Sequence, residues 1–238
     1  ISKILQYEEQ ARIQCHGIHA EQCRDCIFNA NTIFGAIYSG IMISGDGSGS
    51  VFSNNNIDIS VSYVGISVSS GGNLLISGNT IYPDGGQGIS ANDADSSIVS
   101  GNTLELNSSD YAIYMRYCDN CEFSSNISEN PNGHGINGQY SQNSVYADNI
   151  LTVNYNGMFL ESGDSLEVDS NTITGFRTSG VSFQNTENSI FIDNILISTE
   201  YDEQTNYGFY NSYSNSNAIF TNNSIHLQDA NDNNYGIY

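Results

Sequence analysis

Basic residues are scarce in this chain, which has five lysines and arginines against 26 aspartates and glutamates and a formal net charge of -21 at pH 7. A surface of this sign repels nucleic acid and anionic lipid, so neither is expected as a partner. No apolar run approaches the roughly 18 residues that a membrane-spanning helix needs. The sequence therefore predicts no membrane insertion.

Tryptophan is absent and proline occurs only twice, whereas glycine occurs 23 times and tyrosine 16 times. Apolar residues alternate with small polar ones over three to five positions before Gly, Asn or Ser interrupts. Such short alternating runs predict strands, and no stretch between them has room for a packed helix. We therefore expect an all-β fold without helical crossovers.

One sequence unit returns about every 23 residues. A glycine followed by an apolar residue marks each return, with alanine as the single substitute: Gly17, Gly40, Gly65, Gly88, Ala112, Gly135, Gly157, Gly180, Gly208 and Gly236. An Asn-x-Ile/Leu motif, or a close variant, keeps step with it: Asn31, Asn55, Asn79, Asn102, Asn126, Asn149, Asn171, Asn194 and Asn223. A period of this length predicts a solenoid in which each repeat forms one rung.

Each rung reads as three short strands, for example Gly65 to Val68, Leu74 to Ile76 and Thr80 to Tyr82. Without helices, each strand must pair in parallel with its counterpart one rung away. This is a single-stranded parallel β-helix of nine to ten rungs and about 43 Å. We expect one such domain over residues 1–238, as a fragment of a longer protein, with residues 1–22 as the first rung or an N-terminal cap.

Three features of the rung follow from this geometry. The recurring asparagine can bond to the same amide in the next rung, which predicts an asparagine ladder. The recurring glycine indicates a positive φ or a close backbone approach. Five apolar pairs are expected to stack into one core: Ile41/Ile43, Ile66/Val68, Ile113/Met115, Met158/Leu160 and Val181/Phe183.

These repeats resemble the right-handed parallel β-helix superfamily of pectate-lyase-like and NosD-like proteins, over nearly the whole chain. The resemblance implies the fold and an exposed groove, whereas reaction and substrate vary across that superfamily. In those proteins the asparagine turn separates the second and third strands, and ligands usually lie over the first. Carried over to this chain, the groove lies on the outward face of the Gly-Ile strand.

The outward residues of that strand combine aromatic rings with amide and charged groups, which suit stacking on sugars and bonding to their hydroxyls. The candidate carbohydrate-binding residues are Tyr114, Arg116, Asn137, Gln139, Phe159, Glu161, Gln184 and Tyr210. The alternative is that surface tyrosine simply tolerates strands well.

The Gly133-His134-Gly135 sequence resembles the Gly-His-Gly of polygalacturonase active sites. The acid motifs that accompany it there are missing, because the corresponding stretches read Asn92-Asp93-Ala94 and Ser109-Asp110-Tyr111. If the chain is an enzyme, the candidate catalytic residues are Asp93, Asp110, His134, Arg116 and Glu161. The simpler interpretation of His134 is an exposed turn residue, because the position before the repeat glycine varies from rung to rung. A lyase reaction would need calcium to supply the missing positive charge.

Five cysteines include two Cys-x-x-Cys pairs, Cys23/Cys26 and Cys118/Cys121, at the same place in their rungs. Four rungs, or about 19 Å, separate the pairs, so one metal cannot hold both. Each pair either closes a local disulfide or stays reduced, and the two pairs are disulfide candidates. Cys15 has no obvious partner.

The two longest rungs carry acidic turns, in which oxygen ligands recur at the spacing of a calcium loop. The candidate calcium ligands are Asp202, Asp229, Asn231 and Asn233, although solvated surface acids are the simpler interpretation. Calcium is the single cofactor that the sequence suggests.

Two classes of function remain. The first is an extracellular or cell-surface rod, adhesin-like and structural, which binds a polysaccharide or cell-surface glycan and joins further β-helix rungs of its parent chain. The second is a polysaccharide hydrolase or lyase with its site on the same face. We favour the rod, because the chain lacks a complete catalytic set.

Overall fold

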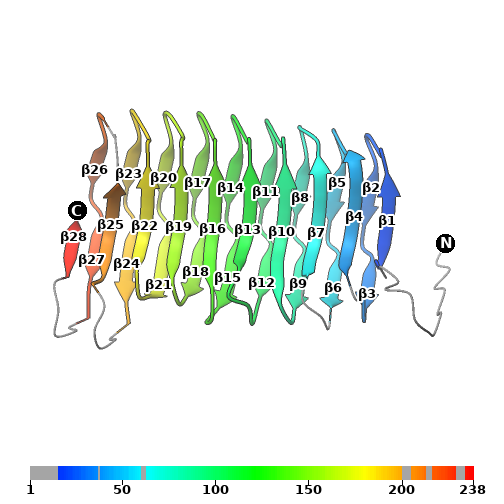
Figure 1. The fold of residues 1–238 in the computed structure, drawn as a ribbon, viewed down its shortest axis with the longest axis horizontal. Helices are drawn as coiled ribbons and strands as arrows, with labels where there is room; N and C mark the ends of the chain where they lie inside the picture. The colour runs from blue at the N-terminus through cyan, green and yellow to red at the C-terminus, as the bar shows by residue number, and fades with distance from the viewer. Residues whose placement is uncertain (1–15, 37, 60–62, 200–204, 213–215, 229–233) are drawn as a thin grey trace.

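The computed structural model describes residues 16–36, 38–59, 63–199, 205–212, 216–228 and 234–238. The described chain is an all-β parallel solenoid in which three sheets run the length of a rod, with β1 at one end and β28 at the other (Figure 1). Every strand pairs in parallel with its counterpart one turn away. The predicted fold class is therefore confirmed.

The first sheet holds the Gly-Ile strands: β1 (Ile18–Glu21), β4 (Ser39–Asp46), β7 (Tyr63–Ser70), β10 (Gly86–Asn92), β13 (Tyr111–Arg116), β16 (His134–Gln139), β19 (Asn156–Glu161), β22 (Ser179–Gln184), β25 (Tyr207–Ser212) and β28 (Tyr235–Ile237). The second sheet comprises β2 (Ile27–Asn29), β5 (Val51–Ser53), β8 (Leu75–Ser77), β11 (Ile98–Ser100), β14 (Glu122–Ser124), β17 (Val145–Ala147), β20 (Glu167–Asp169), β23 (Ile190–Ile192) and β26 (Ile219–Thr221).

The third sheet comprises β3 (Thr32–Phe34), β6 (Asn56–Ile59), β9 (Thr80–Pro83), β12 (Thr103–Glu105), β15 (Ile127–Asn130), β18 (Ile150–Val153), β21 (Thr172–Phe176), β24 (Ile195–Ser198) and β27 (Ser224–His226). Three consecutive strands form one rung, so rung 1 is β1 to β3 and rung 9 is β25 to β27. β28 begins a tenth rung.

The core runs along the axis of the rod. All five predicted apolar pairs are fully buried, because alternate residues of each first-sheet strand point inward. One rung departs from the pattern: Gly138 occupies an inward position, and a Cβ there would collide with the hydroxyl of the buried Tyr146. The missing side chain makes room for this ring.

The asparagine ladder extends from Asn31 to Asn223. Each side-chain amide donates to the carbonyl oxygen of the next ladder asparagine at 2.8–3.0 Å. The same amide group also bonds to a strand carbonyl, as Asn126 does to Val99 at 2.9 Å. The residue before each ladder asparagine has a φ of 53 to 63°, which turns the chain sharply between the second and third sheets.

The repeat glycines from Gly17 to Gly208 serve close approach rather than a positive φ, whereas a Cβ at Gly236 would make only an ordinary contact. A Cβ at Gly65 would collide with the Ile81 side chain across the core and with the Gly88 carbonyl of the next rung. Ala112 fits because the residue that faces it, in the position of Ile81, is the small Ser128. The buried Ser128 hydroxyl has no hydrogen-bond partner, so the Ala112/Ser128 pair is less stabilising than a pair such as Gly65/Ile81.

The structure joins Cys23 to Cys26 and Cys118 to Cys121 by disulfides, with Cα atoms 5.7 and 5.8 Å apart. Cys15 and most of the expected cap region lie outside the described residues, and so do all four candidate calcium ligands. Those predictions stay untested. None of the described segments is a helix with the length and apolar character needed to cross a membrane.

Candidate functional site

The outward face of the first sheet carries the predicted carbohydrate-binding residues in two parallel rows. Register pairing places Tyr114 beside Asn137 and Asn137 beside Phe159. The second row, two residues further along the strands, runs Arg116, Gln139, Glu161 and Gln184. Tyr210 continues the first row two strands beyond Phe159.

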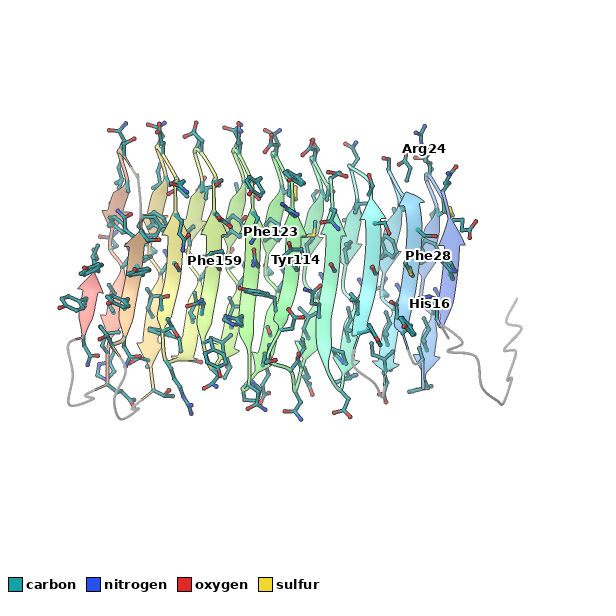
Figure 2. All side chains as sticks on the ribbon, in the orientation of Figure 1. His16, Arg24, Phe28, Tyr114, Phe123 and Phe159 are labelled. Atoms are coloured by element: carbon teal, nitrogen blue, oxygen red, sulfur yellow. A yellow bond between two sulfur atoms is a disulfide. The ribbon has the colours of Figure 1, made fainter. Side chains whose placement is uncertain are left out.

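This face carries two aromatic clusters: one at the β28 end, with Tyr207, Tyr210, Tyr235 and Tyr238, and a larger one on rungs 5 to 7. We call the larger one the central patch, and it consists of Tyr111, Tyr114, Arg116, Tyr117, His134, Asn137, Gln139, Tyr140, Tyr155, Phe159 and Glu161. Figure 2 places Tyr114 and Phe159 at the middle of the rod. The sequence pattern did not predict four tyrosines of the patch: Tyr111, Tyr117, Tyr140 and Tyr155. A signal for three of them was present, because Tyr111 and His134, and likewise Tyr117 and Tyr140, are 23 residues apart.

His134 lies between two tyrosine rings. Its ring centroid is 4.6 Å from that of Tyr111 and 5.2 Å from that of Tyr155, with the rings nearly parallel. Its Nδ1 accepts the Asn156 backbone N–H at 3.2 Å, which leaves the proton on Nε2. Burial lowers the pKa of His134 and the charge of Asp110 only partly offsets this, so the ring is neutral at pH 7.

A second group of aromatic rings, Tyr117 and Tyr140, lies at the other edge of the patch. The rings of Tyr117 and Tyr140 stack at 5.0 Å, and the Arg116 guanidinium lies 4.7 and 5.3 Å from their centroids. Both tyrosines have a positive φ, 52 and 54°. The equivalent turn position has a positive φ in other rungs as well, for example at Asp93, Ser162 and Asn185, so the fold sets this conformation; a bulky residue that adopts it is strained.

Polar groups at the centre of the patch are incompletely paired. Asn137 is 2% exposed, and its Oδ1 has no hydrogen-bond partner. Burial raises the pKa of Tyr111; a hydrogen bond with Asn137 opposes this rise, and the charges of Asp110 and Glu161 add to it. The Glu161 carboxylate is partly exposed and makes no hydrogen bond to the described residues. The patch therefore offers one accessible acceptor, the Glu161 carboxylate, beside aromatic rings, whereas Asn137 Oδ1 is buried beneath them.

The candidate catalytic residues do not converge. Asp110 and His134 lie together at the start of the strands, where the two backbones bond at 3.0 Å. Asp93 follows β10 at the opposite end of the sheet, roughly 20 Å along the strand direction. Inverting hydrolysis needs carboxylates about 6.5–9.5 Å apart, so this pair does not supply it.

A hollow in the described surface lies elsewhere. It encloses about 480 Å³ beside the third sheet and includes the carboxylates of Asp58, Asp84, Glu105 and Glu129 in its lining. It does not include any residue of the central patch. The patch is therefore an open strand face rather than an enclosed pocket.

Solved structures with this architecture include enzymes that act on polysaccharides. A mutant of the periplasmic alginate epimerase AlgG aligns over 82% of this chain and 62% of its own, with 13% identity and a TM-score of 0.57. The enzymatically active domain of tailspike protein 2 from bacteriophage CBA120 aligns over 87% and 48%, with 11% identity and a TM-score of 0.45. The chain thus spans about half to three fifths of these two relatives, and at such identities the likeness shows the fold alone.

The A-module of mannuronan C-5 epimerase AlgE6 from Azotobacter vinelandii aligns over 88% of this chain and 79% of its own, with 11% identity and a TM-score of 0.45. No curated protein matches the sequence significantly. The family model of the periplasmic copper-binding protein NosD matches residues 4–115. The model of the right-handed β-helix region matches residues 105–238, more than half of the chain, so this protein belongs to the right-handed β-helix family.

Proposed function

We propose that this protein is an extracellular β-helix rod that binds a neutral glycan through the central patch. The observation that carries the proposal is the concentration of rings on rungs 5 to 7, which the adjoining rungs 4 and 8 lack, although further tyrosine contacts lie toward both ends of the sheet. The same outward positions hold Ser67 and Ser90 in the rungs before the patch, and Ser179 and Ser182 in the rung after it. General tolerance of tyrosine in strands does not account for that contrast.

The chemistry of the patch suits a sugar. Aromatic faces stack on the C–H faces of pyranose rings, and the partly exposed Glu161 carboxylate suits hydroxyl donors. The strained tyrosines at 117 and 140 support the same reading, because small polar residues in their place would remove the strain. A rigid sheet also holds the rings in place without an ordering cost on binding.

Charge favours a neutral ligand over a uronate. Asp110 and Glu161 lie on or beside the patch, whereas Arg116 is its single cation and is held by two rings. The chain as a whole carries a net charge of -21. An acidic polysaccharide would therefore be repelled both at long range and at the site.

An extracellular or periplasmic location agrees with two features. Two disulfides close turns in the described chain, and disulfides persist in oxidising compartments. Two of the proteins to which the chain is similar, NosD and AlgG, are described as periplasmic.

Calorimetric titration with hexasaccharides of glucose, of N-acetylglucosamine and of galacturonic acid tests the proposal. We expect saturable binding of a neutral hexasaccharide, weak or no binding of the uronate, and loss of at least tenfold in affinity in Tyr114→Ser/Phe159→Ser. Tyr82→Ser, on the outward row of the third sheet, is the matched control and keeps full affinity. Equal loss in the control, or no binding of any neutral sugar, contradicts the proposal.

The same incubations address the enzymatic alternative. We expect mass spectrometry to find every sugar at its original length, with and without calcium, because Asp93 and Asp110 are far apart. Shortened or unsaturated products that disappear in His134→Gln would instead favour a hydrolase or lyase.

A further inference from the structure

His16 and His134 occupy the same repeat position, directly before Gly17 and Gly135, but their surroundings differ. His134 accepts a backbone N–H through Nδ1. His16 has both ring nitrogens buried, and neither has a hydrogen-bond partner. An imidazole that loses water without gaining a partner is unfavourable, so the pocket around His16 lacks a bonding group.

A second imidazole lies next to this unpaired ring. The centroids of His16 and His19 are 4.9 Å apart, with the rings tilted by 48°. Two imidazoles that bind one metal through nitrogens at about 2.0–2.1 Å have centroids roughly 5 Å apart. His19 already contacts Ser44 Oγ through Nε2 at 2.8 Å, which leaves Nδ1 available. Bonding of the second nitrogen to an oxygen is the usual support of a metal-bound histidine.

A thioether completes the group. Met42 is the register partner of His19 on the neighbouring strand, and its neighbours Ile41 and Ile43 are fully buried. Met42 therefore projects outward beside the two histidines. The other two methionines of the chain, Met115 and Met158, are buried in the core. In rungs 6 and 7 the positions of His19 and Met42 hold Asn137 and Phe159 instead.

We propose that His16, His19 and Met42 form a copper(I) site at the β1 end of the rod, where Figure 2 labels His16. The thioether is a soft donor that favours Cu(I), and imidazole also suits copper, so Met42 is the ligand that favours Cu(I) over zinc, and the absence of oxygen ligands from the set disfavours calcium. No cluster of three histidine, cysteine, aspartate or glutamate side chains suited to a metal occurs in the described ranges, so a harder site does not compete there. The residues matched by the copper-binding family model include all three ligands.

Copper(I) titration against a chromophoric chelator tests the site. The protein is used under anaerobic conditions without a thiol reductant, so that the Cys23–Cys26 disulfide stays closed. Cys15 is alkylated beforehand because a free thiol would also take Cu(I). We expect one Cu(I) per chain, with zinc at least tenfold weaker, and an X-ray absorption spectrum with two nitrogen donors and one sulfur donor.

Matched variants separate this site from general copper affinity. His16→Asn and Met42→Leu should each weaken Cu(I) binding at least about tenfold. Met42→Leu keeps the volume of an outward side chain, so its fold should be unchanged. His134→Asn, at the equivalent repeat position, should bind as tightly as the parent protein. Equal affinity in all three variants, a tenfold loss in His134→Asn, or a spectrum without sulfur overturns the proposal.

Discussion

Rungs 2 to 4 and rungs 5 to 7 of the first sheet share one backbone and differ on their outer face. Inward, the residue after the repeat glycine is Ile41, Ile66 and Ile89 in the first group and Ile113, Ile136 and Met158 in the second. Outward, the following residue is Met42, Ser67 and Ser90 against Tyr114, Asn137 and Phe159. The interior therefore maintains the rod, while the exterior is free to specialise rung by rung.

The largest expected loss of stability is the same in rungs 2 to 4 as in rungs 5 to 7. Asn79→Ala and Asn149→Ala each remove an amide that bonds to a strand carbonyl and to the next ladder asparagine. Each change also leaves two donors of the preceding asparagine unpaired. We expect each to lower the free energy of unfolding by about 3 kcal/mol, measured by urea denaturation. A difference above about 1 kcal/mol between the two variants would break the equivalence of the rungs.

A somewhat smaller effect should appear at the one rung without a repeat glycine. Ser128→Ile restores the side-chain type of Ile81 but forces it against the Cβ of Ala112, so we expect a loss of about 1–3 kcal/mol. Ala112→Gly together with Ser128→Ile recreates the pair of the other rungs and should regain most of this loss. If the double variant is no more stable than Ser128→Ile, the two residues do not compensate each other.

Changes at the strained tyrosines should affect binding more than stability. In Tyr117→Asn and Tyr140→Asn, asparagine accepts the positive φ that tyrosine tolerates poorly, as Asn185 does in rung 8. The relief of strain offsets the lost stacking, so the free energy of unfolding should change by less than about 0.5 kcal/mol. Affinity for a neutral hexasaccharide should fall about fivefold, because one edge of the patch is gone. Stability that falls with unchanged affinity would make these tyrosines structural.

The smallest effect concerns pH. The folded-state pKa of His134 is lowered, chiefly by burial, so below pH 6.5 the unfolded chain binds more protons at this residue than the native protein does. The stability associated with neutral His134 is therefore present above about pH 6.5 and is lost as the pH falls toward the lowered value. We expect His134→Gln to show a shallower decline in urea midpoint between pH 7.5 and 5.5. A steeper decline in the variant would contradict the sign.

The regular part of the fold was predictable because it repeats. Asn126 was identified as one ladder position among nine, and the structure bonds it to its neighbours on both sides. The sequence alone allows two physical causes for the repeat glycine, a positive φ or a close approach, and only contacts across the core, such as that of Gly65 with Ile81, decide between them. That Ser128 compensates for Ala112 also could not be predicted, because the sequence does not show which third-sheet residue faces Ala112.

The candidate site was predictable in part for the same reason. Tyr114 and Phe159 follow from strand alternation, because residues two apart share a face. Tyr117 and Tyr140 lie where alternation ends and the chain turns with a positive φ, so the strand pattern did not select them. Asp93 is close in sequence to the repeat residue Gly88 and Asp110 to the repeat residue Ala112, but the two acids lie at opposite ends of their strands.

Covalent footprinting with and without the N-acetylglucosamine hexasaccharide compares the two regions within one molecule. The account predicts protection of β13, β16 and β19, centred on Tyr114 and Phe159, and unchanged labelling of β4 and β7. Equal protection along the whole first sheet, or protection confined to β4 and β7, would contradict the claim that the central patch is the binding site.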